Sequence, residues 1–402
     1  MPVNVRSGGR GVGLAVIGCG TTGRIRARLA SENPGVHWLG VCDLKVDLAA
    51  ALAADAGADY VTTDFAELIR RPEVTAVIVA TDENAHVEPV LAALEHGRSL
   101  LIEKPLATDP VVSGQMLRMI AESGADAIVG YTQRFRRRFL TARQRIRDDQ
   151  IGDVTTVVAR AFMNRMVPMA TLRRTGRKGA LTPMVVSGTH SVDVCLWLLD
   201  GLAGKQPVEV YARAGNRVLG GIGTLDSTVA VVTLEDGTLW SMNINWALPV
   251  QWPGSVYGLE IGVVGTRGVI DIGDTHRDAI IASELPQGAG YQPEGFAAGA
   301  PRHVDFLGSY PPGDLHEGAL WGPMREETTT WIHRLLTGAA TPHATAAEAH
   351  RNLVLTMAMD LSARAGEAVP LPVDTAILRQ DEATPSHAAS GGASPSRDAQ
   401  AT

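Results

Sequence analysis

The sequence predicts an α/β protein in two parts. A Rossmann domain with a parallel sheet comes first, and an α+β domain with a large, open, mostly antiparallel sheet follows. In the first third, short apolar runs alternate with helix-forming segments, which is typical of a parallel sheet covered on both faces. A glycine-rich turn joins the first apolar run to the first helical segment. After residue 131, strand-like segments follow one another through short turns, which is typical of antiparallel sheets.

The first part contains short apolar runs that we interpret as strands. They are residues 14–17, 36–42, 76–80, 99–102 and 127–130. Helical segments separate them at residues 22–31, 45–56 and 84–96. Asp64 and Glu67 have the spacing of a capping box at the start of a short helix, and Asp109 is expected to cap the helix that follows the fourth strand.

The second part is predicted to form an antiparallel sheet with helices on one face. Its strands are residues 154–162, 208–214, 227–234, 239–246, 257–264 and 268–272. Thr182 and Pro183 indicate the start of a helix that runs to about Asp200. Residues 275–324 form a Gly/Pro-rich insertion that we interpret as a covering loop. Thr345 and Glu348 form a capping box for a last, amphipathic helix.

These patterns predict four segments along the chain. Residues 1–11 are a flexible lead-in, and residues 12–131 form the Rossmann domain. Residues 132–373 form the domain for substrate binding and oligomerisation, whose C-terminal helix can pack back on the first domain. Residues 374–402 are a disordered tail, because Ala, Ser, Gly and Pro offer little apolar surface to offset the ordering entropy.

Composition excludes several classes of function. The 402 residues include 36 Lys and Arg against 43 Asp and Glu, and this net charge of −7 argues against a nucleic-acid partner. No apolar run approaches the ~18–20 residues of a membrane-spanning helix. The three cysteines are widely spaced and form no CxxC pair, so we expect a cytoplasmic protein without disulfides and without a metal site.

The glycine-rich turn runs from Gly18 through Gly20 to Gly23, directly after the first strand. The first glycine permits the tight turn, the second lets the backbone approach a pyrophosphate, and the third allows close packing of helix on strand. Thr21 and Thr22 lie at the helix N-terminus that would face the phosphates.

Asp43 follows Gly23 by 20 residues, at the end of the second strand. A carboxylate there binds a ribose 2′-hydroxyl and repels a 2′-phosphate, so NAD is favoured over NADP. The nearby Lys45 keeps NADP open as the less favoured alternative. The alternative interpretation is a lipoprotein leader ending at Cys19, but its apolar region is short and interrupted by glycines.

Several motifs resemble the Gfo/Idh/MocA family of oxidoreductases, over roughly residues 12–373. They are the glycine turn, Thr81 before Asn84 and His86, Glu103-Lys104-Pro105, Gly130 to Phe135 with Arg134, and Gly188-Thr-His190-Ser-Val-Asp193. The resemblance implies an NAD-dependent enzyme that oxidises a hydroxyl of a sugar or cyclitol, or reduces the corresponding carbonyl. It also implies cofactor contacts from Thr81, Asn84, His86, Glu103 and Lys104, and a homodimer or homotetramer through the second sheet.

The chemistry of alcohol oxidation requires a base for the hydroxyl proton while a hydride leaves carbon. Histidine suits this role, and His190 lies on the predicted helix with Ser187 one turn before it and Asp193 one turn after it. We therefore expect His190 to accept the proton and Lys104 to orient the reacting oxygen. Arg134, Ser187 and Asp193 are expected to bind substrate.

One position departs from the family pattern. The family usually has Asp four residues before this His, where the chain has Val186. Asp193 is no simple replacement, because the family commonly has Asp there as well. Three possibilities stay open: a mechanism with Lys and His alone, a different substrate geometry, or loss of dehydrogenase activity. The competing functions are a hydrolase or epimerase that retains NAD and uses transient oxidation, and a non-catalytic nucleotide-binding sensor.

Overall fold

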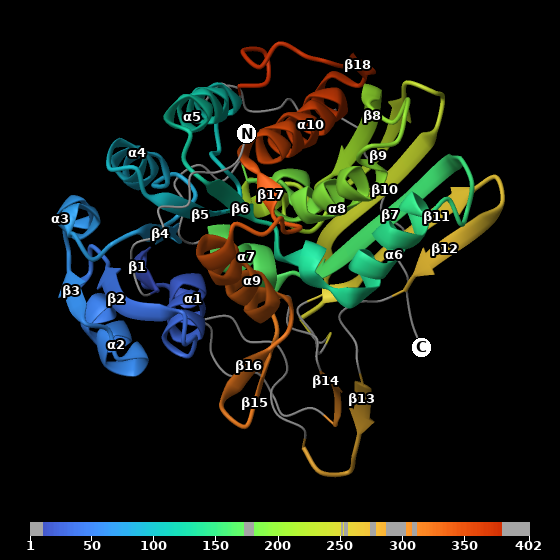
Figure 1. Ribbon diagram of the computed structural model, residues 1–402. Helices are drawn as coiled ribbons and strands as arrows, with labels where there is room; N and C mark the ends of the chain where they lie inside the picture. Colours follow the sequence, from blue (N-terminus) through green and yellow to red (C-terminus); the bar gives the residue numbers. More distant parts are fainter. Residues whose placement is uncertain are drawn as a thin grey trace.

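The structure is a computed structural model that describes residues 11–172, 181–250, 252, 256–273, 279–286, 303–307 and 312–379. Two seven-stranded sheets dominate this part of the chain (Figure 1). The first is a parallel Rossmann-type sheet, and the second is mostly antiparallel with helices on one face. The predicted fold class is confirmed.

The first sheet has the order β17-β6-β5-β4-β1-β2-β3, in which β1 lies between β4 and β2. Its parallel strands are β1 (Val12–Ile17), β2 (Val36–Cys42), β3 (Tyr60–Thr62), β4 (Ala76–Val79), β5 (Ser99–Glu103) and β6 (Ala127–Gly130). All six residues of β1 are buried, because helices cover both faces. The strand order reverses beside β1, and open α/β sheets bind ligands outside the carboxyl ends of the strands at such a point.

Helices of the first domain connect these strands much as the sequence predicts. They are α1 (Thr21–Ser31), α2 (Val46–Ala56), α3 (Phe65–Arg70), α4 (Val87–Glu95) and α5 (Pro110–Ser123). Asp64 caps α3 by accepting the Ala66 and Glu67 N–H groups. The capping box is incomplete, because the Glu67 carboxylate accepts the Thr62 and Tyr60 hydroxyls instead of the Asp64 N–H. That part of the prediction is wrong.

The second sheet has the order β12-β11-β7-β10-β9-β8-β18, in which only β7 and β10 pair in parallel. Its strands are β7 (Val154–Asn164), β8 (Pro207–Gly215), β9 (Ser227–Leu234), β10 (Leu239–Leu248), β11 (Val256–Gly265), β12 (Gly268–Ile272) and β18 (Val369–Pro370). Helices α6 (Arg137–Arg147), α8 (Thr189–Leu199) and α10 (Ala346–Ala365) cover one face (Figure 1). Buried and exposed residues alternate along β7 and β9, which leaves the other face open.

The chain returns to the first domain before it ends. Helix α9 (Pro323–Thr337) packs Trp331 and Ile332 into the core of the first sheet, and β17 (Ala344–Thr345) pairs with β6. The sequence-based prediction places residues 132–373 in the second domain, and only their last helix is expected to pack back on the first domain. Helix α9 also packs on the first domain, which corrects that assignment. An amphipathic pattern shows that a helix has an apolar face but does not show which sheet covers it.

The predicted insertion contains two hairpins rather than a plain loop. They are β13 (Ala279–Ala282) with β14 (Val304–Leu307), and β15 (Asp314–His316) with β16 (Ala319–Trp321). They project from one end of the molecule in Figure 1. Short helical segments complete the described structure: η1 (Thr132–Phe135), α7 (Met166–Leu172), the π-turn η3 (Met184–Gly188) and η4 (Gly220–Ile222).

Most residues of the two predicted tails, 1–10 and 380–402, lie outside the described part of the chain. Residues 374–379 are described, and they form turns in which Leu378 is fully buried in the core of the second domain. The ordered chain therefore extends past the predicted boundary at residue 373. Among the helices of the described ranges, none is long and apolar enough to cross a membrane. Cys19, Cys42 and Cys195 are buried free thiols.

Candidate active site

The turn between β1 and α1 has the shape that a dinucleotide pyrophosphate requires. Gly18 has a φ of 97°, and a Cβ added there would lie 2.4 Å from the Ala80 carbonyl oxygen. A Cβ on Gly23 would lie 1.8 Å from the Gly18 carbonyl oxygen, which is the close helix–strand approach that the third glycine serves. A Cβ on Gly20 meets no atom within 4 Å, so this position is open to a ligand. Thr21 is exposed and Thr22 half-buried at the same helix start.

Asp43 stands beside this turn. Its Oδ2 accepts the Cys19 N–H at 2.8 Å, and its Oδ1 accepts the Lys45 N–H at 2.9 Å. Each oxygen keeps a lone pair for a ribose hydroxyl. These residues fit an NAD molecule. Residues 12–17 form a fully buried interior strand of the first sheet, which argues against the interpretation that they belong to a leader.

Replacing Gly20 by alanine is expected to weaken NADH binding about tenfold while leaving unfolding stability within about 0.5 kcal/mol. The added methyl occupies only the open space where the phosphates would approach, since Gly20 already has extended backbone angles. Fluorescence titration with NADH and a thermal unfolding curve measure the two effects. Gly23→Ala is the contrasting variant, because its methyl would collide with backbone and should destabilise the fold itself. Equal losses of stability in both variants would contradict this interpretation.

The segment after β4 brings three predicted cofactor contacts together. The Thr81 hydroxyl lies 2.8 Å from His86 Nδ1, and His86 is buried with its Nε2 unpartnered. Burial lowers the pKa of His86, and the nearby Lys104 charge lowers it further against the opposing charges of Glu83 and Glu103. Asn84 is exposed, and its Oδ1 accepts the Thr108 hydroxyl at 2.6 Å.

Glu103 is bound to protein rather than directed at a ligand. Its carboxylate accepts Arg26 Nε at 2.9 Å, and the fully buried Arg26 also pairs with Glu327 at 2.5 Å and bonds the Thr328 hydroxyl at 2.7 Å. Burial raises the pKa of Glu327 to about 7, against the Arg26 charge. The cluster joins α1, β5 and α9, so Glu103 anchors the strand end that carries Lys104. The cofactor contact that the resemblance implies for Glu103 stays a prediction.

Lys104 reaches from the first domain to the helix region that carries His190. Its Nζ donates to the Val186 carbonyl oxygen at 3.4 Å, and its charge acts on His190. The ring of Tyr131 lies edge-on to His190 with ring centres 6.2 Å apart, and the Tyr131 hydroxyl lies 2.9 Å from the Thr189 hydroxyl. The structure thus brings the two predicted catalytic groups to one place.

His190 is half-buried, and its Nδ1 is buried without a hydrogen-bond partner. Burial lowers the pKa of His190 to about 3, and the positive charges of Lys104 and Arg136 contribute to the shift. The imidazole is therefore neutral at neutral pH and able to accept a proton. The sequence-based expectation that His190 titrates near neutrality is not met in the free protein, because burial disfavours the charged imidazolium and the cations Lys104 and Arg136 lower the pKa further.

The helix start before His190 differs from the prediction. Thr182 accepts the Val185 N–H at 3.1 Å as expected of a cap, but Met184–Gly188 form a π-turn before the regular helix α8. Ser187 is buried, and its Oγ accepts the Trp246 Nε1–H at 2.8 Å. Ser187 therefore faces the second sheet, and the predicted common face with His190 does not form.

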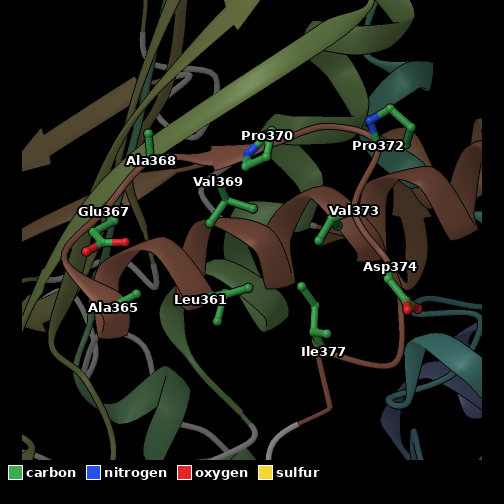
Figure 2. Close-up of a pocket in the computed structure, with 10 residues that line it drawn as sticks. All are labelled: Leu361, Ala365, Glu367, Ala368, Val369, Pro370, Pro372, Val373, Asp374 and Ile377. Carbon is green, nitrogen blue, oxygen red and sulfur yellow. The ribbon is translucent and has the colours of Figure 1, made fainter.

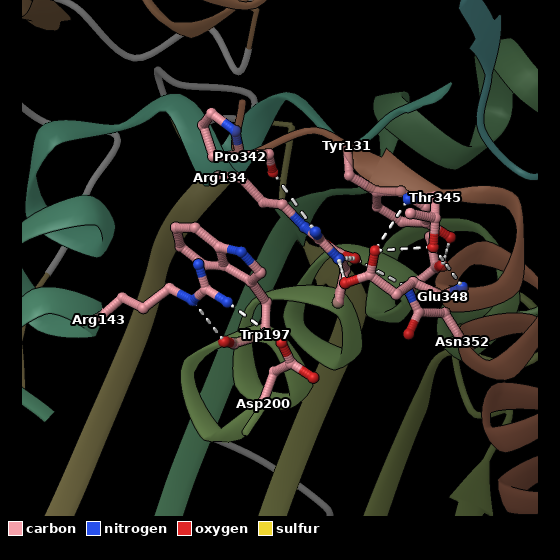
Figure 3. A network of polar contacts seen from close by, with 11 residues as sticks. Tyr131, Arg134, Arg143, Trp197, Asp200, Pro342, Thr345, Glu348 and Asn352 are labelled. Carbon is pink, nitrogen blue, oxygen red and sulfur yellow. Dashed lines mark hydrogen bonds and ion pairs between the residues drawn. The ribbon is translucent and has the colours of Figure 1, made fainter. Parts of the chain in front are cut away.

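Arg134 and Asp193 form a buried ion pair. Arg134 donates from Nε and Nη2 to the two Asp193 oxygens at 2.8 and 2.6 Å, and it also pairs with Glu348 at 3.0 Å. Asn352 donates to Asp193 at 2.8 Å, and Trp197 lies 5.5 Å from the guanidinium (Figure 3). These contacts join the end of β6, α8 and α10. Arg134 and Asp193 are buried and their polar atoms point at each other, so this geometry offers no direct support for their predicted substrate-binding role, which stays a prediction.

Asp360 on α10 supports the cap of the π-turn. Its Oδ2 accepts the Thr182 hydroxyl at 2.6 Å, and burial raises the pKa of this carboxyl from 3.8 to about 7. Between these values the folded protein holds a proton that the unfolded chain releases. The free energy of unfolding is therefore expected to fall as pH rises from about 4 to 7, by at most about 1.4 kcal/mol per pH unit. Urea titrations at a series of pH values measure this dependence of unfolding free energy on pH. Asp360→Asn should make the dependence weaker, whereas Asp47→Asn, at an exposed position, should leave it unchanged.

Sequence reasoning did not identify Arg26, Tyr131, Asn352 or Asp360. Tyr131 lies inside the motif from Gly130 to Phe135, but its contact with Thr189 depends on how the two domains pack against each other. The other three act through partners more than 150 residues away, and no spacing pattern signals them.

Two other features bear on the choice of site. No group of His, Cys, Asp and Glu side chains within the described ranges could hold a metal ion. A hollow of about 340 Å³ lies between the end of α10 and the segment that follows it (Figure 2). It is lined mainly by apolar side chains, among them Leu361, Val369 and Ile377, and contains none of the candidate catalytic groups.

Comparison with known proteins gives two matches to sequence families. Residues 12–131 match the oxidoreductase family with an NAD-binding Rossmann fold, Gfo/Idh/MocA, and residues 139–271 match the Gfo/Idh/MocA C-terminal domain. Together the two matches span more than half of the chain.

Individual relatives agree with these matches. The chain is 25% identical to inositol 2-dehydrogenase of Rhizobium meliloti over 70% of its own length and 80% of the relative. It is 28% identical to 2,7-anhydro-N-acetylneuraminate hydratase of Mediterraneibacter gnavus, over 65% and 67% of the two chains. The crystal structure of scyllo-inositol dehydrogenase from Lactobacillus casei with NAD(H) and scyllo-inositol has a TM-score of 0.70 at 19% identity, and covers 90% of this chain and 99% of that one.

Proposed function

Because the chain belongs to the Gfo/Idh/MocA family of NAD-binding oxidoreductases, we propose that Lys104 and His190 act together on one hydroxyl of a polyol substrate. The protein is an NAD-dependent enzyme that acts on CH–OH groups. A sugar or cyclitol is the proposed substrate class, since relatives and structural neighbours are inositol dehydrogenases.

The observation that carries the proposal is the approach of Lys104 to the segment that precedes His190. The two groups come from different domains, yet the Lys104 ammonium bonds the Val186 carbonyl and its charge reaches the His190 ring. A small molecule that contacts one group is therefore within reach of the other. The unpartnered Nδ1 of His190 supports a role with a ligand, since buried polar atoms are otherwise almost always bonded.

Each side chain has a separate task in this proposal. NAD, when bound, accepts the hydride in oxidation. Neutral His190 accepts the hydroxyl proton, and Lys104 donates a hydrogen bond to the same oxygen and stabilises its developing negative charge. Arg26 and Glu103 fix the end of β5 on which Lys104 is placed, and Tyr131 supports the start of α8.

The residues that would hold NAD follow from the same geometry. The Gly18–Gly23 turn would receive the pyrophosphate, with Thr21 and Thr22 at the N-terminus of α1. Asp43 would bind the ribose hydroxyls, and Thr81, Asn84 and His86 would lie along the path towards Lys104. This arrangement supports NAD over NADP, because Asp43 would repel a 2′-phosphate.

A screen of sugars and cyclitols with NAD and with NADP tests the proposal. Appearance of NADH with a polyol is the expected result. His190→Ala should abolish it while NADH binding, followed by fluorescence, persists. Robust NADH formation by the His190→Ala enzyme would overturn the proton-acceptor assignment.

A second candidate is an enzyme that retains NAD and oxidises its substrate only transiently, as in a hydratase, hydrolase or epimerase. Two observations favour it: Val186 stands where the family usually has Asp, and one relative is a hydratase. Product would then form without accumulation of NADH. Binding of NAD without any product would instead support a non-catalytic sensor.

We also propose a homodimer or homotetramer built through the open face of the second sheet. Several apolar side chains are exposed along the strands of that face, and exposed apolar surface is typical of an interface. They are Val158, Val229, Val231, Leu239, Val264 and Val269. Size-exclusion chromatography with light scattering tests this assignment, and a monomer at micromolar concentration would overturn it.

A further inference from the structure

The turn before α8 carries the carbonyl group that Lys104 contacts. Met184–Gly188 form a π-turn, and the Val186 carbonyl oxygen inside it accepts a hydrogen bond from Lys104 Nζ at 3.4 Å. A π-turn holds one residue more than an α-helical turn, is rare, and occurs frequently at functional sites. The position of the Lys104 ammonium therefore depends on how this turn is held, as well as on the end of β5.

Thr182 holds the start of the π-turn through two of its atoms. Its hydroxyl oxygen accepts the Val185 N–H at 3.1 Å, and its carbonyl oxygen accepts the Val186 N–H at 3.1 Å. Thr182 is buried, so these bonds are shielded from water. Val186 is thus held by Thr182 through its N–H and bonds Lys104 through its carbonyl oxygen.

Asp360 fixes Thr182 from a different helix. Its Oδ2 accepts the Thr182 hydroxyl hydrogen at 2.6 Å, and both side chains are buried. The other carboxyl oxygen, Oδ1, is buried and has no hydrogen-bond partner among the residues that the structure describes. A buried acid with an unpartnered oxygen is costly, and an apolar side chain would avoid that cost. Space filling between α10 and the turn therefore does not explain an acid here, whereas its bond to Thr182 does.

The two halves of the π-turn are held by different parts of the protein. Ser187 Oγ accepts the Trp246 Nε1–H at 2.8 Å, which fixes the second half of the turn to β10. The first half, up to Val186, is held by Thr182 and, through it, by Asp360.

We infer that Asp360, through Thr182, positions the ammonium of Lys104. The line of contacts runs from α10 to the ammonium in three hydrogen bonds, of 2.6, 3.1 and 3.4 Å. At position 186, where the family usually has Asp, a backbone carbonyl held in this way accepts the hydrogen bond from the ammonium. This inference rests on the proposed function, which gives Lys104 its place in the reaction.

Thr182→Val and Thr182→Ser test the inference by turnover. Valine keeps the shape of threonine but removes the hydroxyl, so we expect kcat/KM to fall at least about tenfold while NADH affinity stays within about twofold. Serine restores the hydroxyl and should stay within about threefold of the wild-type value. Thr356→Val is the matched control and should change kcat/KM less than about twofold. Thr356 is also buried, and its hydroxyl bonds the Leu353 carbonyl oxygen within α10.

A double-mutant cycle with Lys104→Ala shows whether Thr182 acts through the ammonium. In the Lys104→Ala enzyme, Thr182→Val should lower kcat/KM by less than about threefold, because the group that Thr182 positions is absent. A loss of about tenfold in both backgrounds would overturn the inference, since it would show an effect that does not pass through Lys104.

A second pair of variants tests Asp360 itself. Asp360→Leu removes the acceptor of the Thr182 hydroxyl and should reproduce the loss of turnover seen for Thr182→Val. Asp360→Asn keeps an acceptor oxygen and should retain turnover within about threefold of the wild-type value. Wild-type turnover of the Asp360→Leu enzyme would overturn the inference.

Lysine labelling provides a readout that needs no turnover. Acetic anhydride acylates the free amine, and loss of the carbonyl bond to the ammonium favours the free amine. Lys104 should therefore be labelled at least about threefold faster in Thr182→Val than in the wild-type protein, as measured by mass spectrometry of its peptide. The exposed Lys45 in the same sample is the internal reference and should be labelled at an unchanged rate. An unchanged or slower rate at Lys104 would overturn the inference.

The two readouts separate the inference from the proposed function. Faster labelling of Lys104 in Thr182→Val, together with normal turnover of the Lys104→Ala enzyme, would support the positioning of Lys104 and overturn its proposed role in the reaction. Unchanged labelling, together with lost turnover of the Lys104→Ala enzyme, would overturn the inference and support the proposed function.

Discussion

Lys104→Ala is expected to lower kcat/KM by about 10²–10³-fold, the usual loss when one donor to a developing oxyanion is removed. Lys104 bonds the Val186 carbonyl through a single contact, so its removal leaves no buried charge unpaired and the fold should persist. Turnover is measured with the best polyol of the substrate screen, and stability is measured by thermal unfolding.

Arg70→Ala is the matched control for this variant. Arg70 is exposed and lies in the last turn of α3 in the same domain, which leads to the amino end of β4 rather than to the carboxyl ends of the strands, where Asp43 and Lys104 lie. It should change turnover less than about twofold, as surface substitutions away from a site usually do. Near-normal turnover of the Lys104→Ala enzyme would remove Lys104 from the mechanism.

Arg134→Ala is expected to lower the free energy of unfolding by about 3–5 kcal/mol. Asp193 is fully buried, and without Arg134 its carboxylate would keep only the Asn352 amide as a polar partner among the residues that the structure describes. The loss of the ion pair is more severe than the burial of an apolar residue, because an uncompensated charge stays in a region of low dielectric constant. Urea unfolding at pH 7 gives the change directly.

Arg143→Ala provides the comparison, since its guanidinium also lies against Trp197, at 4.5 Å from the ring. Its partner Asp200 is about half exposed, so this ion pair should contribute no more than about 1 kcal/mol. A small loss for Arg134→Ala, similar to that of Arg143→Ala, would show that the Arg134–Asp193 pair is not what holds α8 to the end of β6.

The sequence predicts the cofactor half of the site well, because the residues that form it lie close together along the chain. The glycines at positions 18, 20 and 23 are all explained by the turn of the first βα unit itself. Asp43 lies at the end of the adjacent strand. Lys104 follows the same logic, since its position at the end of β5 fixes the sheet edge to which it belongs.

The substrate half was harder to predict, because its geometry depends on distant partners. The spacing of Ser187, His190 and Asp193 places them on one face only if the helix is regular, and the π-turn before α8 breaks that assumption. Asp193 and Arg134 look like exposed recognition groups in the sequence, whereas Glu348 and Asn352, from a helix much later in the chain, enclose them.

The return of the chain to the first domain limits how this protein could be divided or recombined. A fragment that stops near residue 131 would lack Trp331 and Ile332 in its core and would leave the β6 edge bare of β17. It would also lose Glu327, one of the two carboxylates that neutralise Arg26. A nucleotide-binding module cut from this chain would therefore need residues 323–349 grafted onto it, and chimaeras with relatives should exchange both stretches together.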